Sequence, residues 1–291
     1  MGQAALDTYT ITAVNGVAYG LLLFCAAAGM SLIFGVAGVL NLAHGTLYLA
    51  GAYTAWLLAD GGWTGLALAL ATGAAVGGLG GAGLATAMRP LTGRHLDQAL
   101  ATLGIAFIGA DGFSAVFGAE PRSVDPPAAL AGTITLAGNS YPAWRLTFIA
   151  VAALIAIALF FVIERTRTGA VIRAVVADPA MAAATGIPTR TVQTGVLAAG
   201  GALAVSAGVL GAPVLGPAPG VDTTILLHAL IICVVGGLGS IRGAFVAAIG
   251  VGQVQTLGVA LAPAAASFLL AAAMLAALTW RRTTLIVGRP A

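Results

Sequence analysis

The sequence has no lysine: all 12 of its basic residues are arginine. A Walker A phosphate-binding loop requires a lysine, so this chain does not bind and hydrolyse ATP through such a loop. Charged residues make up only 7% of the 291 residues, against about 25% in a soluble domain. The net charge of +3 is spread over connecting segments, and no clustered basic patch points to nucleic acid. These absences argue against an ATPase, a soluble domain and a nucleic-acid-binding protein.

Cysteine and catalytic patterns are equally scarce. The two cysteines, Cys25 and Cys233, lie within apolar segments, where they are expected to be small core residues and not a disulfide or a metal site. The sequence shows no paired carboxylates, no Ser/His/Asp spacing and no metal-ligand cluster. We therefore expect no enzyme, membrane-embedded or soluble, and no cofactor.

Long apolar runs dominate the chain. Hydrophobic residues make up 60% of it, and 41 residues are glycine, which suits close helix packing in lipid. Since a spanning helix needs about 20 mostly apolar residues, the sequence predicts an all-α polytopic membrane protein, a single transmembrane domain over 1–291 with about nine spans. The predicted spans are residues 15–36, 41–59, 64–88, 99–118, 146–163, 191–210, 223–235, 244–261 and 264–280.

The arginines set the expected orientation. With nine spans, the groups after the third span, between the fifth and sixth, between the seventh and eighth, and after the ninth all fall on one side. The positive-inside rule then puts the N-terminus outside and the C-terminus in the cytoplasm. Residues 164–190 become a cytoplasmic loop. Segments 41–59 and 223–235 are short enough to be half-helices or re-entrant pieces instead, so the count ranges from eight to ten.

Residues 119–145 become a long external loop, expected to pack over the mouth of the protein. Its Tyr141 and Trp144 are interpreted as anchors at the membrane interface, where aromatic rings are common.

The most polar run between apolar segments, residues 164–190, carries its own helix signals. Asp178 is a good N-cap, Pro179 fits the first helical position, and Gly186 followed by Pro188 closes the helix. The predicted helix, Pro179 to Thr185, is too short to be stable alone in water and should dock against something. It is either a contact point for a soluble partner or an ordinary connecting loop.

Three polar side chains within apolar segments are candidate pathway residues. Asn41 and His44 lie three positions apart, on one face if the segment is helical; they line a path at a helix break, or Asn41 simply caps a helix start. His228, in the middle of TTILLHALIICVV, faces the bundle interior for function or makes an interhelical hydrogen bond. The glycine-rich run GGLGSIRG at 236–243 lacks the phosphate-loop patterns and predicts a tight turn.

Four segments, in this order, resemble a known family. They are SLIFGVAGVLNLAHGTLYLAGAY at 31–53, ATLGIAFI at 101–108, RTRTGAVIRAVVADPAMAAATGI at 165–187, and GGLGSIRGAFVAAIGVG at 236–252. They are similar to the permease subunits of branched-chain amino acid ABC importers of the LivH type, over nearly the whole chain. One departure is that alanine-rich stretches such as 262–273 leave few polar residues to define a substrate.

The resemblance implies a type II-like ABC importer permease, multi-pass in the bacterial inner membrane, that moves branched-chain or other small hydrophobic amino acids. It also implies the partners of the chain: a second similar permease, two cytoplasmic ABC ATPases and a periplasmic substrate-binding protein, together with the lipid bilayer. The family's cytoplasmic loop contacts the ATPase, a role that maps here onto Asp178, Pro179, Ala182, Ala183 and Gly186.

Two alternatives remain open at this point. The same architecture also serves urea and short-chain amides, and more distantly sugars. A stand-alone ion-coupled transporter would use Asp111 or His228 as the carrier of a proton or sodium ion.

Overall fold

The computed structural model describes residues 3–38, 40–136 and 139–265, together with 268–269, 271–276 and 279. Within this part of the chain the helices are α1 (Gln3–Ala37), α2 (His44–Leu58), α3 (Trp63–Ala87), α4 (His95–Phe117), α5 (Ala143–Arg165), α6 (Arg167–Ala177), α7 (Pro179–Ala184), α8 (Thr189–Gly211), α9 (Val221–Gly236) and α10 (Ile241–Leu261). Short 3-10 turns occur at Arg89–Leu91, Ala128–Leu130 and Pro263–Ala265.

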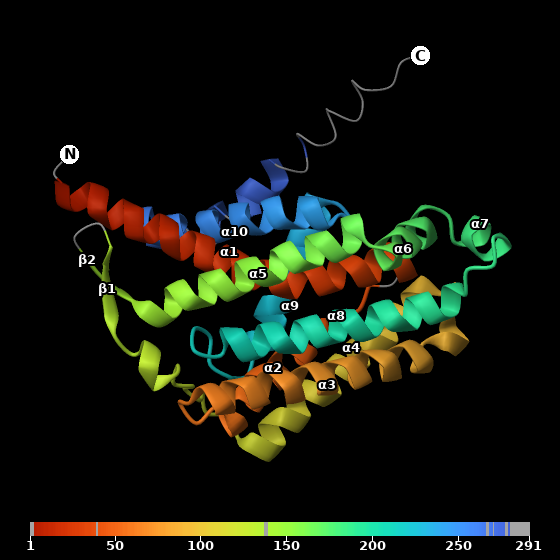
Figure 1. Cartoon of the computed structure of the whole chain (residues 1–291), viewed down its shortest axis with the longest axis horizontal. Coiled ribbons are helices and arrows are strands. Elements are labelled where there is room, and N and C mark those ends of the chain that lie inside the picture. Colours follow the sequence, from red (N-terminus) through yellow and green to blue (C-terminus); the bar gives the residue numbers. More distant parts are fainter. Residues whose placement is uncertain are drawn as a thin grey trace, which may run out of the picture.

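The external excursion contains one departure from an all-α fold. Strands β1 (Thr133–Leu136) and β2 (Asn139–Pro142) pair antiparallel, with Thr133 opposite Pro142 and Ile134 opposite Tyr141. The hairpin lies beside the N-terminal part of α1 (Figure 1). It was not predicted because its strands are only four residues long, too short to show an alternating pattern.

Six helices in the described part of the chain are long and apolar enough to cross a membrane: Tyr9–Ala37 of α1, then α3, α4, α5, α8 and α10. The segments predicted as spans two and seven are the 15-residue α2 and the 16-residue α9. At about 1.5 Å per residue neither reaches the roughly 30 Å of a bilayer core. The predicted span 264–280 is described only in part, at residues 264–265, 268–269, 271–276 and 279, so the count of nine stays a prediction.

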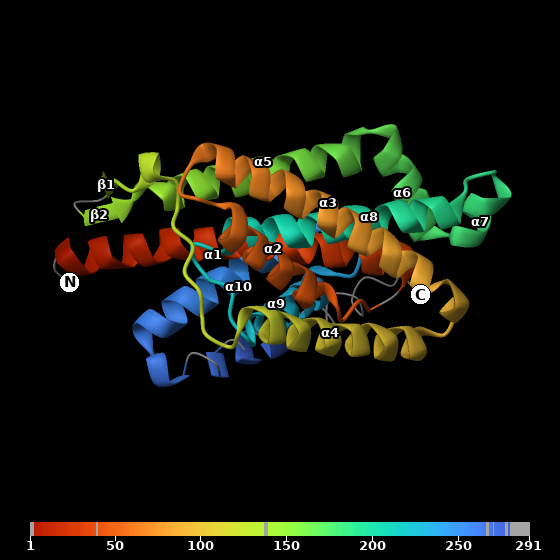
Figure 2. The same cartoon turned by 90° about the horizontal axis from the view of Figure 1, so that it is seen from below.

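Helix α8 lies at the centre of one half of the bundle and packs against α1, α2 and α3, while α1 also packs along α10. Figures 1 and 2 show α1, α3, α5 and α8 following the long axis of the molecule. The contact between α3 and α8 is made through glycine. A Cβ atom at Gly81 would lie 2.1 Å from the carbonyl oxygen of Leu197, so the two backbones touch directly. Such close approach is how helices gain packing energy in lipid.

Most of the arginine-bearing connections described by the structure gather at one end. The end of α3, the beginnings of α4 and α8, and helices α6 and α7 lie together, away from the hairpin and the first residues of α1 (Figure 2). Arg89 and Arg190 line one cavity there, and Arg242 pairs with Glu164 at the end of α5. This grouping agrees with the predicted arrangement of these loops, while the C-terminal arginines lie outside the described residues.

At the opposite end, the segment 119–142 packs over the bundle. The Arg122 N–H donates to the carbonyl of Pro217 at 3.0 Å, and the Ala128 N–H to that of Gly61 at 2.8 Å. Tyr141 is buried, and its hydroxyl donates to Asn15 Oδ1 at 2.9 Å. Burial raises the pKa of Tyr141, which keeps this donor protonated. The prediction of Tyr141 as a membrane-interface anchor was therefore wrong, because its polar end is satisfied inside the protein.

The packing of α3 against α8 is tested by G81A. The added methyl group meets the Leu197 carbonyl, and overpacking of this kind costs about 1–3 kcal/mol. We expect G81A to lower the Tm of the detergent-purified protein by several degrees. G83A is the matched control two residues along the same helix, since nothing lies within 4 Å of its new Cβ; an equal loss in both variants would contradict the contact.

Candidate functional site

Helix α7 begins as the sequence predicts. Asp178 Oδ1 accepts hydrogen bonds from the N–H groups of Ala180 and Met181, both at 2.9 Å, and Pro179 occupies the first helical position. Two donors that a helix start leaves free are thereby satisfied.

The end of α7 is also close to the prediction. The helix stops at Ala184, one residue before the predicted Thr185, which is its C-cap. Gly186 follows with φ of 88°, and the Ile187 N–H donates to the Ala182 carbonyl at 3.1 Å. A left-handed glycine with such a bond is a common helix stop.

Helix α7 presents an apolar side chain to its surroundings. Ala182 is buried against the bundle, whereas Met181 is 63% exposed. Asp178, Pro179, Ala183 and Gly186 are exposed as well. An exposed methionine is flexible and polarisable, which suits an adaptable contact with a partner surface. The predicted role of these residues in binding an ATPase stays a prediction.

Helix α6 ties α7 to the spans. Thr166 caps α6 by accepting from the Gly169 N–H at 3.1 Å, and Val175 is fully buried. Val176 lies against Gly35 of α1 and Gly239 of the glycine-rich turn, whose backbones are nearly in contact. Helix α6 therefore contacts both α1 and the connection between α9 and α10.

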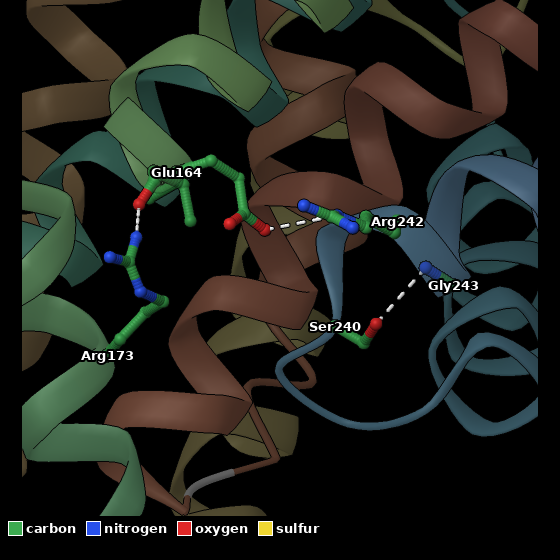
Figure 3. A network of polar contacts seen from close by, with 6 residues as sticks. Glu164, Arg173, Ser240, Arg242 and Gly243 are labelled. Carbon is green, nitrogen blue, oxygen red and sulfur yellow. Dashed lines mark hydrogen bonds and ion pairs between the residues drawn. The ribbon is translucent and has the colours of Figure 1, made fainter. Parts of the chain in front are cut away.

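A polar network reinforces this junction (Figure 3). Arg173 Nη1 of α6 donates to the Ile163 carbonyl at the end of α5, beside which Glu164 pairs with Arg242 of α10, Oε1 to Nε, at 3.2 Å. The Arg242 guanidinium also lies 5.0 Å from the centre of the Phe160 ring. These contacts join the end of α5 to α6 and to the beginning of α10.

The glycine-rich run 236–243 is the tight turn that the sequence predicts. Gly237 and Gly239 have φ of 99° and 78°, and Ser240 caps α10 by accepting from the Gly243 N–H at 3.1 Å. A Cβ at Gly243 would lie 1.8 Å from the Gly236 carbonyl oxygen. The turn packs two helices closely.

Asn41 and His44 lie at a helix break but do not share a helical face. α1 ends at Ala37 and α2 begins at His44, so Asn41 lies in the connection. Its Oδ1 accepts from the Ala43 N–H at 3.1 Å, which closes the turn before α2; the N-cap position itself is Ala43. His44 is fully buried, with Nε2 2.8 Å from the Ala26 carbonyl of α1. In the structure, His44 therefore fixes the beginning of α2 against α1.

His228 lies elsewhere in the bundle. Its Nδ1 is 2.7 Å from the Thr224 carbonyl of its own helix, and its ring meets the edge of Tyr19 with 6.1 Å between ring centres. Within the part of the chain that the structure describes, its Nε2 has no hydrogen-bond partner. Neither His44 nor His228 lines the cavity that Asn41 lines, so the structure does not bring the three predicted pathway residues into one site.

The cavity beside Asn41 has a volume of about 550 Å³ and lies among the ends of α1 and α3 and the beginnings of α4 and α8. Its polar wall is made by Asn41, Arg89, Gln98, Thr102, Arg190, Gln193 and Thr194. Its apolar wall is made by Ala37, Leu84, Ala85, Met88 and Leu197. The volume is within the range of about 300–1,000 Å³ typical of small-molecule sites.

Two buried groups in this wall have no partner. Asn41 Nδ2, a donor, and Gln98 Oε1, an acceptor, make no hydrogen bond within the described chain, although both residues are at least 95% buried. Thr102 is occupied: its hydroxyl accepts from the Leu42 N–H at 3.1 Å and contacts the Leu40 carbonyl at 3.2 Å. Buried polar groups are normally satisfied, so these two amide atoms are exceptions, as are a few others in the described chain such as His228 Nε2.

Most residues of this cavity were not predicted from the sequence. A usable signal was present: Gln98 and Thr102 at the start of α4, and Arg190, Gln193 and Thr194 at the start of α8, are spaced to share one face of each helix. Among the described residues, no group of three or more His, Cys, Asp or Glu side chains could hold a metal ion.

Comparison with known proteins agrees with this architecture. The family model described as "Branched-chain amino acid transport system / permease component" matches residues 12–278. The chain is 28% identical to the LivH permease protein of Salmonella typhimurium, covering 95% of this chain and 94% of that protein. It is 27% identical to LivH of Escherichia coli over the same shares, and 27% identical to BraD of Pseudomonas aeruginosa, covering 95% of each. No solved structure matches. The chain therefore belongs to the permease-component family of branched-chain amino acid transport systems, whose members are multi-pass membrane proteins and not enzymes.

Proposed function

We propose that this chain is the membrane-embedded permease of an ABC importer that moves branched-chain or other small hydrophobic amino acids into the cell. The relatives named above are high-affinity branched-chain amino acid permease proteins, which supports the substrate class. The observation that carries the coupling is α7: a short helix capped by Asp178, with Met181 exposed, on the arginine-rich end between two spans. Two ABC ATPases would bind there in the cytoplasm.

The remaining parts follow from the same proposal. A second similar permease completes the transmembrane unit, and a periplasmic protein delivers the solute to the end bearing the 119–145 excursion. The chain lies in the bacterial inner membrane with its N-terminus outside and its C-terminus in the cytoplasm. Residues 1–291 act as one transmembrane domain.

The contacts of α6 and α8 suggest how force is transmitted. When the ATPases close on ATP, they displace α7, and α6 carries the displacement to the Gly35–Gly239 contact and to the Glu164–Arg242 pair. Helix α8 begins five residues after α7 and carries part of the polar wall of the cavity. Rocking of these spans then exposes the pathway to alternate sides, as expected for two-state transport.

The alternatives are distinguished by experiment. If the chain is a urea or amide permease, substitution of the cavity arginines should leave its transport rate unchanged, because its solute carries no charge. An ion-coupled transporter would move solute without ATPases and would depend on Asp111, which is exposed on α4, or on His228. ATP-dependent uptake by the complete complex, and none by the purified chain with an ion gradient, supports the importer.

Replacing residues 180–184 with a flexible Gly/Ser run removes both the helix and Met181. We expect the ATPase subunits to be lost from pull-downs on the tagged permease. The matched control replaces the 3-10 turn Ala128–Leu130, at the opposite end of the molecule, and should retain them. Unchanged ATPase binding in the first variant would contradict the docking role.

D178A tests whether the cap maintains α7. Losing an N-cap costs about 1 kcal/mol, so we expect amide hydrogen exchange in residues 180–184 to become about fivefold faster. Association with the ATPases should weaken in parallel. D178N keeps an acceptor at the same position and is the control, because asparagine caps helices nearly as well as aspartate. Equal exchange in D178A and the unsubstituted protein would show that α7 is held by other contacts.

A further inference from the structure

The cavity at the arginine-rich end combines two kinds of wall that a single small amphiphile would satisfy. One side carries Arg89 and Arg190, and the other is aliphatic, with Leu84, Met88 and Leu197. None of the described residues lining the cavity is Asp or Glu. The walls therefore favour a guest that brings a negative group and an apolar body.

The unpartnered amides sharpen this description. Asn41 Nδ2, a donor, and Gln98 Oε1, an acceptor, belong to residues that line the cavity, and neither has a hydrogen-bond partner within the described chain. Both atoms are covered in the structure, so a guest reaches them when the two side chains turn toward the cavity. A carboxylate accepts from amide N–H groups and from guanidinium, whereas an ammonium donates to an amide oxygen. One donor and one acceptor beside two arginines complement a zwitterion.

We propose that this cavity is a resting site for a small zwitterionic amino acid with an aliphatic side chain, on the ATPase side of the membrane. The carboxylate is bound by Arg89, Arg190 and Asn41 Nδ2, the ammonium by Gln98 Oε1, and the side chain by the Leu84–Met88–Leu197 wall. This inference rests on the proposed function and names the residues that bind its substrate before release.

The site also gives α8 a way to sense the guest. Arg190, Gln193 and Thr194 all come from the first turns of α8, the helix that follows α7 directly. A guest bound to Arg190 therefore contacts the same element that the ATPases displace. Occupancy of the cavity and movement of α7 are linked through one rigid helix.

The test uses the complete complex in lipid nanodiscs, with Ala85→Cys in the permease as a reporter in the cavity wall. The native Cys25 and Cys233 are buried, 3% and 2% exposed, so a soluble maleimide reports on the new thiol. We expect L-leucine to slow alkylation. Leucinamide, which lacks the carboxylate, and glycine, which lacks the aliphatic chain, should protect at least about tenfold less well, the loss expected when a hydrogen-bonded charge or a buried side chain is removed.

Substitutions then assign the protection to the proposed groups. R89Q, R190Q and Q98L should each raise the L-leucine concentration for half protection by about tenfold, the loss expected for a hydrogen bond to a charged group. R94Q is the matched control: it removes the same charge at the same end, but Arg94 pairs with Asp97 on the surface and does not line the cavity. Equal protection in R89Q, R190Q and R94Q would overturn the assignment.

Two further outcomes would also overturn it. One is an absence of protection by L-leucine. The other is alkylation that responds to the anionic lipid content of the nanodisc and not to L-leucine, which would make the cavity a lipid-headgroup site. ATP-dependent leucine uptake by the same complex is measured in parallel. If leucine is taken up but does not protect the thiol, this inference is wrong and the proposed function still holds. If leucine protects the thiol but is not taken up, the cavity binds leucine and the proposed function is wrong.

Discussion

The direct backbone contact between α8 and its neighbours is the constraint on which the other features depend. In a bilayer, moving an apolar side chain from lipid into a helix interface gains little free energy, because lipid tails are equally apolar. Helices therefore associate where their surfaces fit closely. Here glycine supplies the fit, because the backbone of α8 lies against the backbones of α1, α2 and α3 at Gly29, Gly51 and Gly81. A helix held on three sides in this way moves as a unit.

This constraint joins the two ends of the proposed mechanism. The first turns of α8 line the polar cavity. The loop that precedes α8 follows directly on the capped helix α7. On the other side of α7, helix α6 contacts α1 and the turn before α10 through Val176, and the end of α5 through Arg173. Helix α7, which we propose as the partner-binding segment, is thus attached to both halves of the bundle by short connections. No long linker separates α7 from α6 or from α8, so we expect a movement of α7 to be transmitted to both helices.

The features that follow from local chemistry were predictable from the sequence. Asp178, Pro179 and Gly186 determine a helix start and stop through backbone geometry within a few residues, and the structure confirms them apart from one residue at the end. The glycine-rich turn at 236–243 was predicted for the same reason. The grouping of arginines followed from the order of apolar runs.

The features that depend on distant segments were not predictable. The cavity wall combines residues from the ends of four helices, and only folding brings Asn41 and Gln98 into the same wall. The burial of Tyr141 depends on Asn15, 126 residues earlier in the chain. His44 and His228 look alike in the sequence, since each is a polar residue in an apolar run. In the structure, His44 contacts a carbonyl of α1, whereas His228 contacts the Thr224 carbonyl of its own helix.

In the proposed mechanism, α7 is the contact through which the ATPases drive the spans. The most direct measurement is photo-crosslinking from a benzoylphenylalanine placed at Met181, a large and exposed apolar side chain of α7, in the assembled complex. The account predicts a crosslink to the ATPase subunit whose yield changes when ATP is bound. Crosslinks to lipid or to the periplasmic binding protein, with none to the ATPase, would contradict it.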